Sequence, residues 1–197
     1  MKNPNDLLRD IPDKWESKTT TSKKWKTDLL EFIQSSDVES VLEIGAAVGY
    51  TTHFLAHFVQ KITSVELEQR RIEESKKLSK DLKNITYVCD NVYQGKWKYG
   101  YHDLIIIDCV HEYHYVKKDI ENALSTNCKY LAFDDYGLFP EVKKAVDEEI
   151  AFGRLEVLKK IGYPEGTHFG MSDSPNTTKG RVLSDYEGII CRSLMRK

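Results

Sequence analysis

The sequence has few of the residues that would cross-link the chain, anchor it in a membrane or bind it to a polyanion. Its 197 residues include four cysteines, none in a C-x-x-C pair, and we expect these thiols to stay reduced and to pack as small apolar groups. No apolar run is long enough to cross a bilayer and no signal-peptide-like segment opens the chain, which predicts a cytoplasmic protein with no membrane partner. A net charge of −2 argues against a nucleic-acid partner.

The hydrophobic content of 40% is enough for one sizeable core in a chain of this length. We expect residues 1–19 to form an N-terminal arm outside the core and residues 20–197 to form a single domain. A basic cluster around the first helix is interpreted as a solvated face, with phosphate binding as the alternative; it consists of Lys14, Lys18, Lys23, Lys24 and Lys26. The sequence predicts no oligomeric state.

Strand and helix patterns alternate from residue 41 onward, which is typical of a parallel sheet with helices on both faces. The predicted strands are 41–44, 62–65, 85–89, 104–107, 130–133, 155–161 and 188–194. The predicted helices are 20–34, 50–60, 69–82, 113–124 and 140–151. Residues 162–187 are rich in Gly, Ser, Thr, Pro and Asn and are predicted to form a substrate loop.

A turn bracketed by Gly45 and Gly49 joins the first strand to its helix. A missing Cβ lets the backbone turn sharply and approach a ligand closely. The spacing is E-x-G-x-x-x-G, which differs from the G-x-G-x-x-G of dinucleotide-binding proteins, and Glu43 would repel a phosphate but suit an ammonium. The turn is therefore either a cofactor cradle or a tight turn needed only for packing the strand against the helix.

These residues resemble motif I of the class I S-adenosylmethionine-dependent methyltransferases, and Gly49-Tyr50-Thr51 is similar to the Gly-Tyr-Ser/Thr of the small-molecule O-methyltransferase branch. The resemblance spans about residues 20–194 and implies a Rossmann-like three-layer α/β sandwich. Its seven-stranded sheet would be mostly parallel, with an antiparallel last strand. The implied cofactor is S-adenosylmethionine; an NAD-binding fold is the alternative that the missing third glycine argues against.

Acidic residues follow several of the predicted strands, at the edge where parallel sheets bind ligands. Glu66 lies about twenty residues past the glycine turn, where a carboxylate accepts the hydroxyls of a ribose. In the resembled family, the position of Asp90 and Asn91 borders the adenine. The predicted cofactor-binding residues are Glu43, Gly45, Ala46, Gly49, Tyr50, Thr51, Glu66, Leu67, Asp90, Asn91 and Asp108. Aspartate is also common in solvated loops, which is the alternative at each single position.

Three aspartates match the metal-binding positions of catechol-type O-methyltransferases, namely Asp108 after the fourth strand and Asp134 and Asp135 after the fifth. The match implies a possible Mg²⁺ site that would orient and acidify a substrate hydroxyl. Alternatively, Asp134 and Asp135 only cap the turn before Tyr136.

His111 stands three residues past Asp108, where catechol-type enzymes carry a lysine. Imidazole titrates near neutral pH, so His111 can act as a base; a hydrogen-bonded loop histidine is the alternative. Residues 108–113 also resemble the Asp-x-Asp-His-x-Tyr of sugar O-methyltransferases, except that Val110 replaces the second aspartate. Other side chains considered are His114, expected to be a bystander, and His168, which could contact a substrate. Trp25, Tyr136 and Tyr163 are either aromatic walls of the site or core residues, and aromatic residues at such places are more often core.

We therefore expect a methyltransferase that uses S-adenosylmethionine to methylate a hydroxyl of a small-molecule acceptor, with His111 and Asp108 as its catalytic residues. Methylation of protein or nucleic acid is an alternative, weakened because no Asn-Pro-Pro-Tyr-like segment follows the fourth strand. A binding module without catalysis is a further alternative, suggested by Val110 and by the replacement of the lysine.

Overall fold

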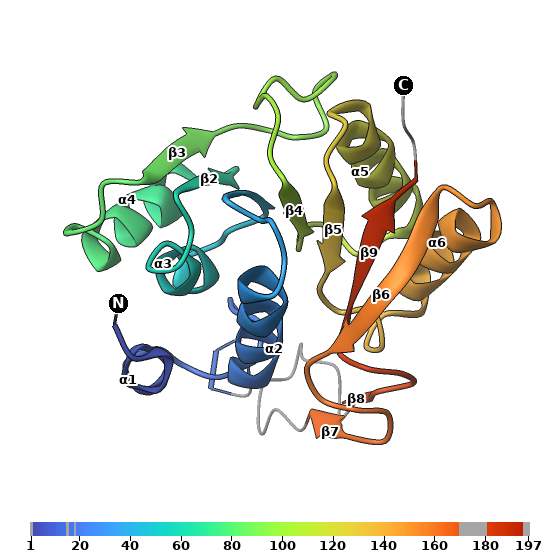
Figure 1. Ribbon diagram of the computed structural model, residues 1–197, viewed down its shortest axis with the longest axis horizontal. Coiled ribbons are helices and arrows are strands. Elements are labelled where there is room, and N and C mark those ends of the chain that lie inside the picture. Colours follow the sequence, from blue (N-terminus) through green and yellow to red (C-terminus); the bar gives the residue numbers. More distant parts are fainter. Residues whose placement is uncertain (1, 15, 18, 170–180, 195–197) are drawn as a thin grey trace.

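The computed structural model, which describes residues 2–14, 16–17, 19–169 and 181–194, is built on a seven-stranded sheet (Figure 1). Its strands are β1 (Ser40–Ile44), β2 (Lys61–Glu66), β3 (Ile85–Cys89), β4 (Leu104–Ile107), β5 (Tyr130–Phe133), β6 (Leu155–Ile161) and β9 (Gly188–Ser193). They lie in the order β3-β2-β1-β4-β5-β9-β6. Strand β9 runs antiparallel to both of its neighbours, while the pairs formed by β1 to β5 are parallel. The predicted α/β fold with an antiparallel last strand is confirmed.

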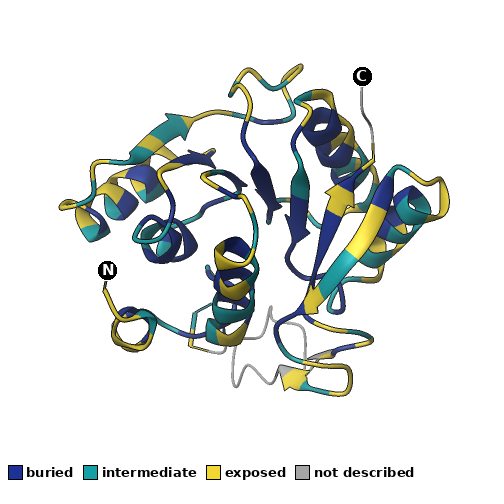
Figure 2. Cartoon of the chain, viewed as in Figure 1, coloured by how far each residue is buried: buried dark blue, intermediate teal, exposed yellow. Residues whose placement is uncertain are grey.

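Helices cover both faces of this sheet. They are α1 (Pro4–Arg9), α2 (Lys23–Gln34), α3 (Tyr50–Leu55), α4 (Gln69–Leu78), α5 (Tyr113–Ser125) and α6 (Pro140–Ala151). One apolar cluster joins the sheet to α1, α2 and α3, and a second joins the opposite face to α5 and α6. Figure 2 shows that the strands in the middle of the sheet are almost wholly buried, as a sheet covered on both sides requires.

The two helices that follow β1 and β2 are shorter than predicted. Helix α3 ends at Leu55 because the amide of Phe58 bonds to the carbonyl of Leu55, three residues back, and closes a tighter turn. Helix α4 ends at Leu78, where Ser79 is the C-cap. The apolar pattern continues through both ends, so the sequence does not mark them.

The N-terminal arm packs against the domain. Asn3 caps α1, with Pro4 as its first residue, and Leu7, Leu8 and Ile11 are buried in the same cluster as α2. The expectation that this segment lies outside the core is wrong, because a single helical turn is too short to show an apolar period.

The predicted substrate loop contains a small hairpin that the sequence did not predict, formed by β7 (His168–Phe169) and β8 (Arg181–Val182). Residues 170–180 of that loop lie outside the described residues. None of the described helices has the length and apolar character that crossing a membrane requires. All four cysteines are described and are unpaired thiols, as expected; Cys128 and Cys191 are buried and Cys89 is exposed.

Candidate active site

The two glycines of the β1–α3 turn each lie against a different neighbouring segment. Gly45 has φ +86°, and a Cβ there would lie 2.0 Å from the carbonyl oxygen of Asp108. Gly49 has φ +79°, and its Cβ would lie 1.9 Å from Oγ of Ser75 on α4. Gly45 therefore lets the loops after β1 and β4 meet, while Gly49 lets α3 pack on α4.

A cavity of about 460 Å³ lies at the carboxyl ends of β1, β2, β4 and β5. Its lining includes Gly45, Ala47, Glu66, Leu67, Arg71, Asp108, Cys109, His111, Asp134, Asp135 and, from the N-terminal arm, Lys14. A smaller cavity of about 90 Å³ shares Gly45, Glu66, Leu67 and Cys109 with it and is also lined by Asp90, Asn91, Tyr93 and Val110. The two cavities form a bent cleft along the edge at which ligands bind to parallel sheets.

The predicted cofactor-binding residues divide into two groups. The residues that line the cleft are Gly45, Glu66, Leu67, Asp90, Asn91 and Asp108. The residues that lie outside both cavities are Glu43, Ala46, Gly49, Tyr50 and Thr51. The sequence analysis did not predict three residues that line the cleft, namely Ala47, Cys109 and Arg71. Their positions relative to the predicted strands did not distinguish them from other loop and helix residues.

Glu43 is buried in β1 and accepts a hydrogen bond from the hydroxyl of Thr52 on α3. Burial raises the pKa of this carboxyl to about 8. At neutral pH Glu43 is therefore mostly protonated, and it does not supply the negative charge that the sequence interpretation gave it.

Glu66 lies where the two cavities meet and is only 7% exposed. Its carboxylate accepts hydrogen bonds from the backbone amides of Ala47 at 2.8 Å and Glu68 at 3.0 Å. These bonds fix its orientation and leave lone pairs on both oxygens for a ligand. In the smaller cavity, Asp90 accepts a bond from the hydroxyl of Tyr99 at 2.8 Å, and Asn91 accepts one from the amide of Tyr93 at 3.1 Å.

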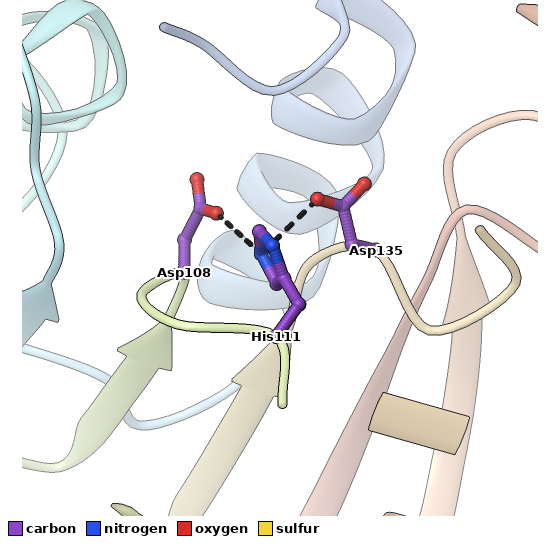
Figure 3. Close-up of side chains that lie close together, drawn as sticks. All are labelled: Asp108, His111 and Asp135. Atoms are coloured by element: carbon purple, nitrogen blue, oxygen red, sulfur yellow. Dashed lines mark ion pairs between the residues drawn. The ribbon is translucent and has the colours of Figure 1, made fainter. Parts of the chain in front are cut away.

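His111 lies between two carboxylates (Figure 3). Its Nε2 is 3.2 Å from Oδ2 of Asp135 and 3.6 Å from Oδ1 of Asp108, and its ring stacks on Phe139 with centroids 4.3 Å apart. Burial lowers the pKa of His111, but contact with Asp108 and Asp135 outweighs it, so the pKa lies above its ordinary value. One ligand atom from each of Asp108, His111 and Asp135 falls within 4.8 Å of the others, a spacing that suits either a base with its orienting groups or a cation.

Lys14 reaches the same end of the cleft. Its Nζ donates to Oδ2 of Asp134 at 2.7 Å and to Oδ1 of Asp135 at 2.8 Å, and it lies 3.4 Å from Oε1 of Glu187. Burial lowers the pKa of Lys14, but the carboxylates around it raise it well above the ordinary value, so the side chain is an ammonium. Of the predicted metal ligands, Asp108 and Asp135 therefore lie beside His111, and Lys14 binds both Asp134 and Asp135.

The interpretation of the basic cluster as a solvated face is wrong for two of its members. Lys14 is buried at the cleft, and Lys26 is fully buried with its Nζ donating to the hydroxyls of Thr20 and Thr21. Lys24 is exposed, as expected, and Lys18 lies outside the described residues. No local pattern marks Lys14, because its partners are 120 and 121 residues away.

The remaining candidates lie away from the cleft. Trp25 and Tyr136 are buried members of the two apolar clusters, so for these two aromatic residues the core alternative holds. Tyr163, His114 and His168 line neither of the two cavities.

Comparison with known proteins identifies the family to which this chain belongs. The family of nodulation protein S, NodS, matches residues 3–158, which is most of the chain. The chain belongs to the NodS family. It is therefore a class I S-adenosylmethionine-dependent methyltransferase, as its motifs predicted, which sets the NAD-binding alternative aside. No curated protein sequence matches the chain.

Solved structures share the fold of this NodS family member at low sequence identity. The N-methyltransferase NodS from Bradyrhizobium japonicum WM9, in complex with S-adenosyl-L-homocysteine, is 18% identical with a TM-score of 0.65, over 98% of this chain and 97% of that one. An O-methyltransferase from Bacillus cereus, in complex with SAH, is 14% identical with a TM-score of 0.66, over 99% and 92%. An rRNA methylase from Streptococcus thermophilus is 15% identical with a TM-score of 0.53, over 99% of both chains.

Proposed function

We propose that this NodS family member methylates a hydroxyl of a small-molecule acceptor, with His111 as the base. The observation that carries the proposal is the position of His111 Nε2, which lies in the wall of the cleft, 3.2 Å from Oδ2 of Asp135 and 3.6 Å from Oδ1 of Asp108. Two carboxylates at these distances stabilise the imidazolium that forms when the ring takes a proton.

The cleft suits S-adenosylmethionine, which when bound supplies a methyl group on a positively charged sulfur. Glu66 is placed to accept the ribose hydroxyls, and Asp90 and Asn91 to border the adenine. Leu67 is 63% exposed and Val110 36% exposed, and both line the smaller cavity, where their apolar surfaces would cover a flat base. Glu43, Ala46, Gly49, Tyr50 and Thr51 would support the turn without lining the cleft.

Transfer then needs alignment and removal of one proton. Bound S-adenosylmethionine would supply the methyl carbon to a lone pair of the acceptor oxygen, with the electrons of the carbon–sulfur bond left on sulfur. The hydroxyl proton passes to Nε2 of His111. Asp108 and Asp135 hold the ring in place and stabilise the imidazolium, while stacking on Phe139 fixes its plane.

The predicted Mg²⁺ set does not fit this geometry. Asp108, Asp134 and Asp135 would have to share one ion, yet the ammonium of Lys14 lies on one oxygen of Asp134 and one of Asp135. A divalent ion at those oxygens would meet a like charge at close range. We therefore assign no step of the reaction to a metal.

An amine acceptor is the second candidate, favoured by the charges at this end of the cleft. The carboxyl groups of Asp108, Asp135 and Glu187 lie around the ammonium of Lys14 at this end of the cleft, and carboxylates in excess of cations attract an ammonium. Burial raises the pKa of Asp134 although Lys14 lowers it, so Asp134 adds less to this charge. The NodS structure from Bradyrhizobium japonicum is named an N-methyltransferase. The same acidic surroundings repel phosphates and so disfavour a nucleic-acid acceptor.

The test is methyl transfer from radiolabelled S-adenosylmethionine to matched pairs of small acceptors that differ only in carrying a hydroxyl or an amine. We expect labelled ether products and a kcat lower by about 10²–10⁴-fold in His111→Ala. The exposed His114→Ala serves as control and should keep its kcat. Labelled amines alone would establish the second candidate, and an undiminished kcat in His111→Ala would overturn the assignment of the base.

A further inference from the structure

The ammonium of Lys14 occupies an unusual position for a residue so near the N-terminus. It contacts carboxylates that follow β5, Asp134 at 2.7 Å and Asp135 at 2.8 Å, and a third that precedes β9, Glu187 at 3.4 Å. The Lys14 side chain is only 11% exposed, and that of Asp134 is 2% exposed. Water screens contacts this deeply buried only weakly, so the positive charge of Lys14 acts directly on these carboxyl groups.

The backbone around Lys14 is held as firmly as its side chain. Oδ1 of Asp13 accepts hydrogen bonds from the amides of Lys14 at 2.7 Å and Lys23 at 3.1 Å, which ties the arm to the start of α2. The carbonyl of Asp13 accepts from the amides of Glu16 and Ser17. Because Leu7, Leu8 and Ile11 are buried as well, the arm presents Lys14 at a fixed place.

This place is one that a bridging cation would take. Adjacent carboxylates that face a common point repel each other unless a positive charge lies between them. A divalent metal would supply that charge in an oxygen-rich site. Here Lys14 supplies it, and it also takes Oδ1 of Asp135, whose Oδ2 faces His111.

We propose that Lys14 is the resident cation of the acceptor site: it holds Asp134 and Asp135 where a divalent metal would otherwise bind, and it positions His111 through Asp135. Lys14 is thus a positioning residue, and methyl transfer needs no metal. The inference rests on the proposed function only in naming this end of the cleft the acceptor site.

The test is a titration with Mn²⁺, followed by the electron paramagnetic resonance signal of the free ion. The chains compared are wild type, Lys14→Met, Lys14→Arg and the control Lys24→Met, which removes an exposed lysine of the same cluster. We expect Lys14→Met to bind one Mn²⁺ at least about tenfold more tightly than the other three chains, because two carboxylates have lost their counter-ion. Titration with S-adenosylhomocysteine, which we propose binds in the other part of the cleft, checks that each variant is folded.

Two results would overturn the proposal. One is a folded Lys14→Met chain that binds Mn²⁺ no better than wild type. The other is wild type that binds Mn²⁺ tightly and loses this binding in Asp135→Asn, which decides the matter even if Lys14→Met does not fold. The titration uses no acceptor and so does not depend on the proposed function. Wild type that binds no Mn²⁺ and also methylates no small molecule would overturn the proposed function, but it would not overturn the role of Lys14.

Discussion

Gly45 lies where the turn after β1 meets the end of β4, and its backbone conformation brings the ligand edge of the sheet together. A residue with a side chain would be strained at φ +86° and would also push against the carbonyl of Asp108. Because Asp108 begins the loop that carries His111, a shift there moves the proposed base. The conformation of one glycine thus affects both stability and catalysis.

Replacing Gly45 with alanine should lower the free energy of unfolding by about 3 kcal/mol or more, since it adds a steric clash to the cost of a left-handed conformation. Gly153→Ala is the matched control, with φ +69° and nothing within 4 Å of its Cβ. It should cost about 1–2 kcal/mol from conformation alone. Urea unfolding measures both variants, and equal losses would show that contact with Asp108 does not constrain the turn.

The raised pKa of Glu43 predicts how the free energy of unfolding depends on pH. Burial raises its folded-state pKa from 4.5 to about 8, so between these values the folded chain holds a proton that the unfolded chain releases. This contribution to stability is full below pH 4.5 and is lost as the pH rises towards 8. Between pH 4.5 and pH 8 the free energy of unfolding of the Glu43→Gln variant should therefore fall by about 2–4 kcal/mol less than that of wild type.

Urea unfolding at several pH values provides the measurement for Glu43. The exposed Glu39→Gln is the control and should follow the wild-type pH dependence. A Glu43→Gln curve parallel to that of wild type would mean that Glu43 is ionised in the folded chain.

Among the elements, α2 connects the N-terminal arm, the sheet and the site. Its N-cap Ser22 accepts a hydrogen bond from the amide of Trp25 at 2.9 Å and donates one to Oε2 of Glu187 at 2.5 Å. Glu187 is fully buried and also faces Lys14. One serine therefore fixes the start of α2 relative to β9 and to the acceptor site.

Removing that hydroxyl in Ser22→Ala should lower the free energy of unfolding by about 2–4 kcal/mol, because it takes away a helix cap and one of the bonds to a buried carboxylate. Ser35→Ala, at the exposed other end of α2, should change it by less than about 0.5 kcal/mol. Thermal or urea unfolding compares the two, and similar effects would mean that the contact with Glu187 adds little.

The elements also show what sequence patterns can and cannot predict. Strands β3, β4, β5 and β6 have the predicted bounds, because polar residues or glycine flank each of them, and β4 and β5 are in addition short buried apolar runs. Helices α3 and α4 are shorter than predicted, since apolar side chains continue beyond their last helical residue and the pattern does not mark where the helix ends. Strands β7 and β8 are only two residues each and leave no period to detect.

At the scale of the whole molecule, sheet order decides which site residues could be predicted. Glu66 is the last residue of β2, Asp90 and Asp108 follow β3 and β4, and the parallel order β3-β2-β1-β4-β5 brings such positions to one edge. Lys14 belongs to no strand, and its contact with Asp134 depends on how the arm packs on the finished domain. The burial of Glu43 depends likewise on α3 closing over β1, which no local pattern reports.

The most direct test of the whole arrangement is calorimetric titration of S-adenosylhomocysteine into wild type and Glu66→Gln, each with EDTA and with Mg²⁺. We predict roughly micromolar binding to wild type that is the same in both buffers, and binding at least about tenfold weaker to Glu66→Gln, which lacks the full carboxylate for the ribose. Absence of binding to wild type in both buffers, or binding only with Mg²⁺, would contradict a metal-free cofactor cleft between Glu66 and His111.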